Sequence, residues 1–127
     1  MNICLYTPSF LPRLGGTEVA VDRLAGQFQA KSHRVLVLAK TPRGTLTRPQ
    51  LPYEVVYYPR SRSNVWLLGP ARRALEDEHR RRRFDVVLAF HAYPNGFLAV
   101  KAGGSLHLPA VISCRGGDLA PRGRFRR

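Results

Sequence analysis

The chain has 127 residues, of which 44% are hydrophobic, and its formal net charge of +13 comes from 18 arginines and three lysines against eight acidic residues. This size suits one domain that buries roughly two thirds of its unfolded surface, and it excludes a second complete domain. The composition excludes a disordered chain, no apolar stretch approaches the length that crosses a bilayer, and the charge favours acidic partners such as nucleic acid, anionic lipid or phosphorylated ligands.

The first half of the chain predicts a strand-helix-strand unit and a further strand. Residues 2–7 form an apolar run, residues 17–31 carry apolar side chains at helical spacing, and residues 34–39 form a second apolar run. Residues 53–58 are rich in β-branched and aromatic side chains, which predicts a third strand. Its tyrosines indicate a partly exposed edge of the sheet.

The second half continues the alternation of helices and strands. Pro70 is suited to open a helix that runs to about residue 82, and residues 85–90 read as a buried strand. A helix is expected over residues 94–102, ended by Gly103 and Gly104, before a fifth strand at 109–113. The pattern predicts one α/β domain over residues 1–120, a doubly wound parallel sheet of strand order 3-2-1-4-5, followed by a loose basic tail at 121–127.

The loop after the first strand has the composition of an anion site. Gly15 and Gly16 precede the first helix, whose free backbone N–H groups favour negative charge. Thr17 or Gly16 is expected to cap the helix, and Glu18 to favour its dipole from the first turn. An ordinary loop with an ordinary cap explains the same residues.

Three loops are expected to meet at one crevice. Gly15-Gly16 follows the first strand, residues 91–96 follow the fourth, and residues 115–118 follow the fifth. In a doubly wound sheet the first and fourth strands are neighbours at the point where the connections diverge, and ligands bind there.

Several common sites are excluded by spacing. The first loop lacks the G-x-G-x-x-G pattern, and Lys40 stands where a nicotinamide dehydrogenase has an acidic ribose partner. No P-loop lysine follows Gly16, and no histidine or cysteine cluster has metal-ligand spacing. We therefore expect neither a metal nor a nicotinamide cofactor.

Four segments carry a specific resemblance. They are N-I-C-L-Y-T-P-S-F-L-P-R-L-G-G-T-E, L-A-G-Q-F-Q-A-K-S-H-R-V-L-V-L-A, F-D-V-V-L-A-F-H-A-Y-P-N-G and L-P-A-V-I-S-C-R-G-G-D-L. Together they resemble the N-terminal, Rossmann-like domain of a retaining glycosyltransferase of the GT-B fold, in the group classified as family four. The resemblance covers nearly the whole chain.

The resemblance implies transfer of a sugar from a nucleotide-diphosphate sugar to a carbohydrate or lipid-linked acceptor, with retention and without an essential metal. In such enzymes the C-terminal domain holds most of the nucleotide and carries paired glutamates. That domain is absent from this sequence, as is the closing part of the N-terminal sheet. We therefore expect a fragment or truncated product that is inactive alone.

The resemblance also assigns residues to the donor side of the crevice. Gly15 and Gly16 match the glycine loop beside the donor diphosphate and sugar. Arg115 stands where many members have a histidine, so this sequence departs from the family there. A guanidinium at this position suits a phosphate or carboxylate, and an ion pair with Asp118 is the alternative.

The acceptor side is assigned to His91, Tyr93, Asn95, Gly117 and Asp118. His91 is the one candidate for catalysis, although sugar binding by a neutral imidazole is favoured over proton transfer. The alternatives are structural: His91 hydrogen-bonds the local turn, and Asp118 caps a following helix.

Partners and location follow from charge and cysteines. Arg72, Arg73 and Arg80–Arg83 form a basic cluster that either docks on an anionic membrane surface or is simply solvated. The other class of function left open is a non-catalytic basic module that binds nucleic acid or a protein, with self-association through an open sheet edge. Cys4 and Cys114 are expected to be buried free thiols, which favours the cytoplasm, with peripheral contact at the inner membrane face if the cluster docks.

Overall fold

Five parallel strands form one sheet in the order β3-β2-β1-β4-β5. They are β1 (Asn2–Thr7), β2 (Arg34–Lys40), β3 (Glu54–Tyr58), β4 (Val86–Phe90) and β5 (Ala110–Ser113). The structure, a computed structural model, describes residues 1–44, 50–60 and 68–119, so the tail predicted at 121–127 lies outside the described residues. The parallel pairing and the strand order confirm the predicted doubly wound sheet.

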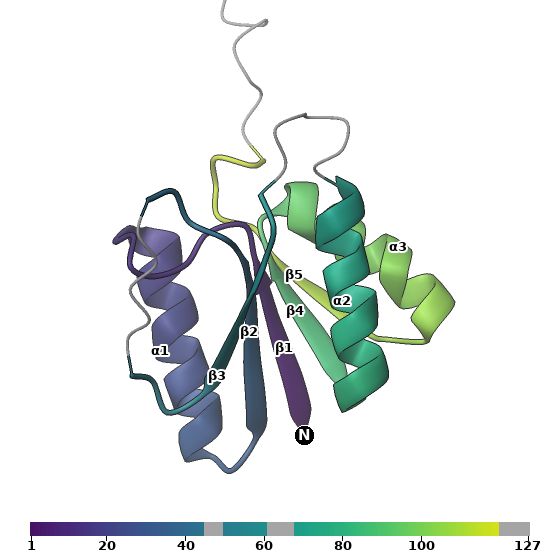
Figure 1. Ribbon diagram of the computed structural model, residues 1–127, viewed down its shortest axis with the longest axis horizontal. Coiled ribbons are helices and arrows are strands. Elements are labelled where there is room, and N and C mark those ends of the chain that lie inside the picture. The colour runs from purple at the N-terminus through teal and green to yellow at the C-terminus, as the bar shows by residue number, and fades with distance from the viewer. Residues whose placement is uncertain (45–49, 61–67, 120–127) are drawn as a thin grey trace, which may run out of the picture.

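Helices cover both faces of the sheet (Figure 1). They are α1 (Gly16–Ala30), α2 (Leu68–Arg82) and α3 (Phe97–Leu106). Successive residues of a strand point to opposite faces, so β1 contributes to two cores. Ile3 and Leu5 pack in the core that contains Val21 of α1, whereas Cys4 packs in the core that contains Leu75 of α2. None of the helices in the described ranges is long and apolar enough to cross a membrane.

The end of α3 differs from the prediction. Gly103 was expected to stop the helix, but α3 continues to Leu106 and ends at His107, which takes the left-handed conformation with φ 53°. Gly103 is buried instead, and a Cβ there would lie 2.5 Å from the carbonyl oxygen of Leu108. The glycine therefore permits the returning chain to approach the helix, and Leu108 N–H donates to the Gly103 carbonyl at 3.0 Å.

The beginning of that helix also differs. A π-helical turn, η1 (Ala92–Gly96), precedes α3, and it is interrupted by the extended backbone of Tyr93. Pro94 therefore lies in this turn, and the regular helix begins only at Phe97.

The two outer strands leave the sheet with different edges. β3 is partly exposed, as predicted, and only its last residue, Tyr58, is buried. β5 exposes Val111 to 53% and Ile112 to 37%. Cys114 follows β5 and is exposed, so the expectation that both cysteines are buried is wrong for this one; Cys4 is buried, and both thiols are free. Burial raises the pKa of the Cys4 thiol, which keeps it protonated and unreactive.

Candidate functional site

The first part of the site is the beginning of α1. Gly15 is the N-cap, with extended backbone and no side-chain hydrogen bond, so the predicted capping by Thr17 or Gly16 is wrong. Thr17 instead turns its hydroxyl toward His91, at 3.4 Å from the imidazole Nε2. The helix N-terminus therefore keeps its dipole without a capping side chain.

The two glycines of this loop have different surroundings. A Cβ on Gly15 would lie 2.6 Å from Glu18 Oε2, so the Glu18 side chain already occupies the space beside Gly15. A Cβ on Gly16 would meet nothing within 4 Å. Of the pair, Gly16 is therefore the one that leaves room at the helix start for a ligand.

Glu18 does more than stabilise the dipole of α1. It is only 5% exposed, it accepts a hydrogen bond from the Ser9 hydroxyl, and its Oε1 lies 3.8 Å from Arg13 Nε. Because Ser9 and Arg13 belong to the loop after β1, the carboxylate ties this loop to the helix.

The second part of the site is the turn after β4. His91 has a φ of 72°, in the left-handed region, and its N–H donates to the Ser113 carbonyl of β5 at 3.0 Å. Its own carbonyl accepts from Gly96 N–H at 3.0 Å. The backbone of His91 thus forms the turn, while its ring reaches the start of α1.

The third part is the loop after β5. Asp118 Oδ2 accepts from Ala92 N–H at 2.6 Å, and Oδ1 accepts from Arg115 N–H at 2.8 Å. These bonds, the Ala92 one foremost, hold the pKa of Asp118 below its ordinary value. Among the ion pairs of the described ranges there is none between Arg115 and Asp118, so their contact runs through the Arg115 backbone.

The remaining predicted residues divide into exposed and buried ones. Tyr93 is 63% exposed, with its ring centroid 5.9 Å from that of Phe97, and Gly117 is also exposed. Asn95 is fully buried, and its Nδ2 donates to the Tyr58 hydroxyl at 3.4 Å. The Asn95 amide therefore joins η1 to β3 within the core and offers no surface to an acceptor.

The three predicted loops do meet. Thr17 and His91 join the loops after β1 and β4, and Ala92 and Asp118 join the loops after β4 and β5. The carboxyl ends of three strands are thus linked at one edge of the sheet, where doubly wound proteins bind ligands. The individual roles assigned to these residues stay predictions.

The sequence profile of Glycosyltransferase Family 4 matches residues 14–127. The chain belongs to this family. No curated protein matches the chain in sequence.

Solved structures agree with this family in fold. Sucrose-phosphate synthase from Thermosynechococcus elongatus matches with a TM-score of 0.64 at 11% identity, over 90% of this chain and 33% of that one. The C-terminal domain of a hydrogenase from Pyrococcus furiosus matches with a TM-score of 0.52 at 15% identity, over 88% of this chain and 90% of that one. The chain therefore has the Rossmann-like fold of a GT-B glycosyltransferase domain and spans about one third of the synthase.

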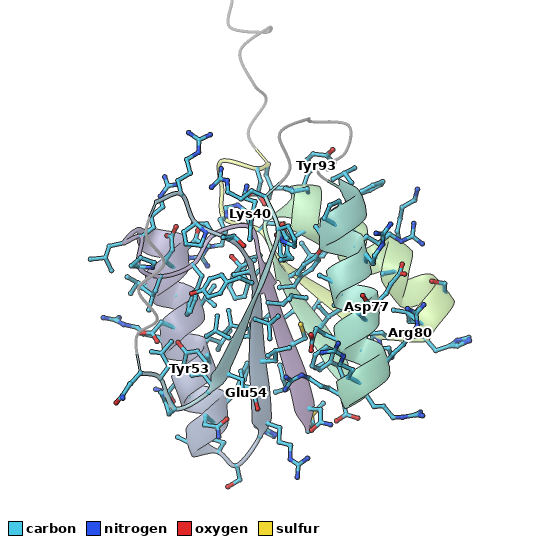
Figure 2. All side chains as sticks on the ribbon, in the orientation of Figure 1. Lys40, Tyr53, Glu54, Asp77, Arg80 and Tyr93 are labelled. Atoms are coloured by element: carbon cyan, nitrogen blue, oxygen red, sulfur yellow. The ribbon has the colours of Figure 1, made fainter. Side chains whose placement is uncertain are left out.

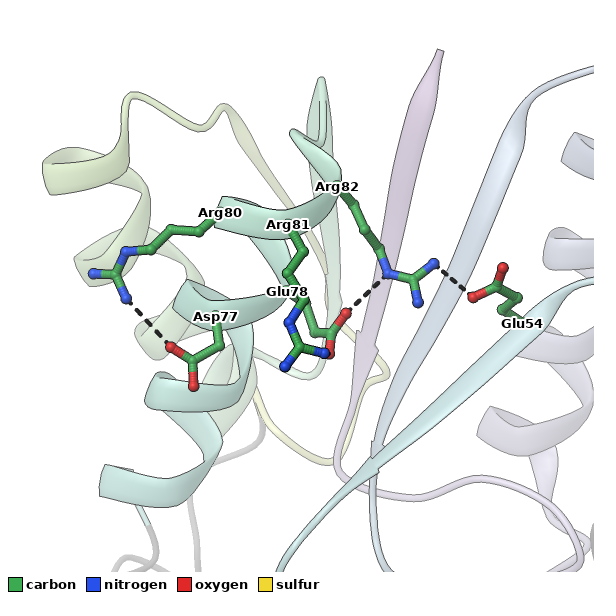
Figure 3. Close-up of polar contacts among 6 residues, drawn as sticks. All are labelled: Glu54, Asp77, Glu78, Arg80, Arg81 and Arg82. Atoms are coloured by element: carbon green, nitrogen blue, oxygen red, sulfur yellow. Dashed lines mark hydrogen bonds and ion pairs between the residues drawn. The ribbon is translucent and has the colours of Figure 1, made fainter.

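The basic cluster of this family 4 domain is largely neutralised by carboxylates (Figure 3). Four arginines of α2 form ion pairs, which are Arg72–Glu76 at 2.7 Å, Arg80–Glu76 at 3.9 Å, Arg80–Asp77 at 3.3 Å, Arg81–Glu78 at 3.8 Å, Arg82–Glu78 at 2.9 Å and Arg82–Glu54 at 2.6 Å. Desolvation opposes the charge of Arg82, but the hydrogen bonds to Glu78 and Glu54 prevail and raise the pKa of this guanidinium. We refer to these residues as the α2 arginine network.

The sequence interpretation missed a second basic group, at the ends of β1, β2 and β3. Arg13, Lys40, Arg43 and Arg60 line a depression of about 700 Å³. The signal was present in the sequence, because each of the three strands ends in or is soon followed by a cation. Within the described ranges, no group of three histidine, cysteine or acidic side chains is placed to hold a metal ion.

Proposed function

We propose that this chain is the acceptor-side domain of a retaining glycosyltransferase that uses a nucleotide-diphosphate sugar. Transfer needs a second domain that holds the nucleotide, so the 127-residue chain alone is inactive. No metal or other cofactor takes part, because the helix dipole at Gly16 and the C-terminal domain share the charge of the diphosphate.

The observation that carries this proposal is the union of the three loops at the carboxyl edge of the sheet. The Thr17–His91 contact and the Ala92–Asp118 hydrogen bond bring the start of α1, the turn after β4 and the loop after β5 together. Membership of Glycosyltransferase Family 4 supports glycosyl transfer as the reaction at this edge.

The proposed role of each residue at this edge depends on how exposed the residue is to a ligand. Gly16 lets the donor diphosphate approach the start of α1, and the exposed Arg115 guanidinium pairs with a donor phosphate. His91 hydrogen-bonds a sugar hydroxyl, and the exposed ring of Tyr93 offers an apolar face to the acceptor sugar. Asp118 acts indirectly, because its carboxylate accepts from Ala92 N–H and Arg115 N–H and so holds the loop after β5 against the turn after β4.

The decisive experiment begins with the gene. The reading frame is followed past Arg127, the chain is expressed together with the second doubly wound domain found there, and release of nucleoside diphosphate from nucleotide sugars is measured. We expect release only when both domains are present, no effect of a chelator, and a product whose anomeric configuration, read by NMR, equals that of the donor. A stop codon with no partner domain, or an inverted product, contradicts the proposal, and the former would favour a binding module.

A matched pair of variants tests the donor contact. Gly16→Ala adds a Cβ that meets nothing within 4 Å, so it leaves the fold intact while it fills the space before the helix. We expect transfer to fall by at least about tenfold, the equivalent of one lost charged hydrogen bond. Gly26→Ala is the control, because it makes the same change in the same helix, also with nothing within 4 Å. Equal activity of the two variants would remove Gly16 from the donor site.

A further inference from the structure

The depression lined by Arg13, Lys40, Arg43 and Arg60 is a second feature of the ligand-binding edge, and we refer to it as the cationic pocket. Its volume of about 700 Å³ lies within the range of small-molecule sites. Figure 2 shows Lys40 at the same end of the sheet as Tyr93. The pocket therefore opens at the edge at which we propose sugar transfer, on the side of β2 and β3.

The parallel sheet brings these cations together. Lys40 is the last residue of β2 and is paired in register with Tyr58, the last residue of β3. Thr41 then binds the Tyr58 carbonyl twice, through its N–H at 2.9 Å and its hydroxyl at 2.8 Å. Arg60 Nη1 donates a hydrogen bond to the Thr41 carbonyl at 3.4 Å, which holds the guanidinium at the pocket.

The charges of the pocket are almost uncompensated. Within the described ranges, the only ion pair of its four cations is the one between Arg13 and Glu18, at 3.8 Å. Burial lowers the pKa of Lys40, and the neighbouring guanidinium groups of Arg60, Arg43 and Arg13 lower it further. In the described part of the chain, Lys40, Arg43 and Arg60 thus lie close together without a carboxylate to balance their charge.

The four cations of the pocket are better suited to a phosphate group than to a carboxylate. A carboxylate is satisfied by one bidentate guanidinium, whereas a phosphate presents several charged oxygens that three arginines and a lysine are able to share. The pocket is distinct from the donor side, because Gly15, Gly16, His91 and Arg115 are not among its lining residues. The loop after β1 separates the two, with Ser9 lining the pocket and donating to Glu18 beside Gly15.

We propose that the cationic pocket binds a phosphate group carried by the acceptor, an assignment of substrate class that rests on the proposed glycosyltransferase function. The acceptor phosphate lies against Lys40 and Arg60, and its sugar or alcohol extends across the loop after β1 toward His91. The phosphate belongs either to a soluble phosphate ester or to a lipid headgroup.

Binding of inorganic phosphate to the 127-residue chain, measured by calorimetry at constant ionic strength, tests the pocket directly. Lys40→Gln and Arg60→Gln should each weaken binding by about tenfold, the effect of one charge-assisted hydrogen bond. Arg73→Gln is the matched control, because it removes the same charge from the exposed face of α2 and should change the affinity less than about twofold. Equal losses in all three variants would show general charge attraction and overturn the proposal, as would absence of binding.

Two further probes identify the source of the phosphate. Glycerol 3-phosphate represents soluble esters, and vesicles of phosphatidylcholine with phosphatidic acid, compared with phosphatidylcholine alone, represent headgroups. Binding of either probe that is lost in Lys40→Gln but kept in Arg73→Gln supports the proposal and names the source. Binding of neither probe overturns it, even if free phosphate binds.

The outcome is separable from that of the proposed function. In the two-domain protein, transfer to a phosphate-bearing acceptor that is unaffected by Lys40→Gln would refute the pocket and leave the glycosyltransferase standing. Phosphate binding that depends on Lys40, in a protein that releases no nucleoside diphosphate, would refute the glycosyltransferase and leave the anion site. Urea unfolding of each variant verifies that the substitutions act on binding and not on folding.

Discussion

The two arginine-rich regions of this domain differ in how far carboxylates balance their positive charge. In the α2 arginine network, the carboxylates of Glu54, Glu76, Asp77 and Glu78 lie within ion-pair distance of the guanidinium groups. In the cationic pocket, Arg13 is the one cation that pairs with a carboxylate among the residues that the structure describes. A net charge of +13 therefore does not indicate where an anion binds; the distribution of the eight acidic residues does.

The largest change in stability is expected from Arg82→Gln in the α2 arginine network. This change leaves Glu78, whose side chain is 9% exposed, without its main partner. We expect unfolding free energy to fall by about 1–2 kcal/mol, below the full range for charged hydrogen bonds because 35% of the Arg82 side chain is exposed. Urea unfolding measures it, and Arg73→Gln on the same helix should stay within about 0.5 kcal/mol of the parent. Equal effects of the two changes would break the comparison.

In the cationic pocket we expect the opposite change, a rise in the free energy of unfolding. Lys40→Gln removes one of several mutually repelling cations, and we expect it to stabilise the fold by about 0.3–1 kcal/mol. Because the folded pKa of Lys40 is lowered, the penalty of its charge is fully present below that pKa and is relieved as the pH rises toward 10.5. The advantage of the variant in urea unfolding should therefore shrink at alkaline pH. Destabilisation by Lys40→Gln would mean that the pocket cations are compensated after all.

Glu18→Gln tests the effect of removing a carboxylate, in place of a cation, from beside the cationic pocket. It removes the carboxylate that pairs with Arg13, while the amide oxygen retains an acceptor for the Ser9 hydroxyl. Phosphate affinity should rise about two- to fivefold, the value of a weak ion pair. Calorimetric titration measures this change, and an unchanged affinity would separate Glu18 from the pocket.

The smallest effect concerns the loops on the other side of the edge. Asp118→Asn should weaken the hydrogen bonds to Ala92 and Arg115, and faster amide exchange at Ala92 in NMR spectra would report it. Because the pKa of Asp118 is lowered, its contribution is present above the ordinary value of 3.8 and is lost as the pH falls through the folded value. The protection factor of the Ala92 amide, which is its exchange rate corrected for the intrinsic pH dependence, should therefore fall at acidic pH in the parent and stay flat in the variant.

Most of the sheet could be predicted because buried parallel strands are continuous apolar runs. The prediction of β1 agrees with the structure at both ends, and the order of all five strands is correct. The end of α3 could not be predicted, since Gly103 is required by Leu108 from the returning chain and not by the conformation of the helix end. Local rules for glycine do not contain that tertiary contact.

The site was predictable to the level of its loops and not to the level of its side chains. The meeting of the loops near Thr17, His91 and Asp118 follows from topology. The burial of Asn95 against Tyr58 depends on the irregular turn η1, which no spacing in the sequence indicates. In the α2 arginine network, the Arg72–Glu76 spacing is local, but Arg82 and Glu54 are joined only by the fold.

The exposed β5 edge has a consequence for handling the protein. Val111 and Ile112 are uncovered on a strand whose outer backbone groups offer a template for pairing with a second molecule. The repulsion between chains of charge +13 opposes such pairing at low ionic strength, and salt screens it. Concentrated stocks of the chain should therefore keep best in dilute buffer and turn cloudy first where salt is high.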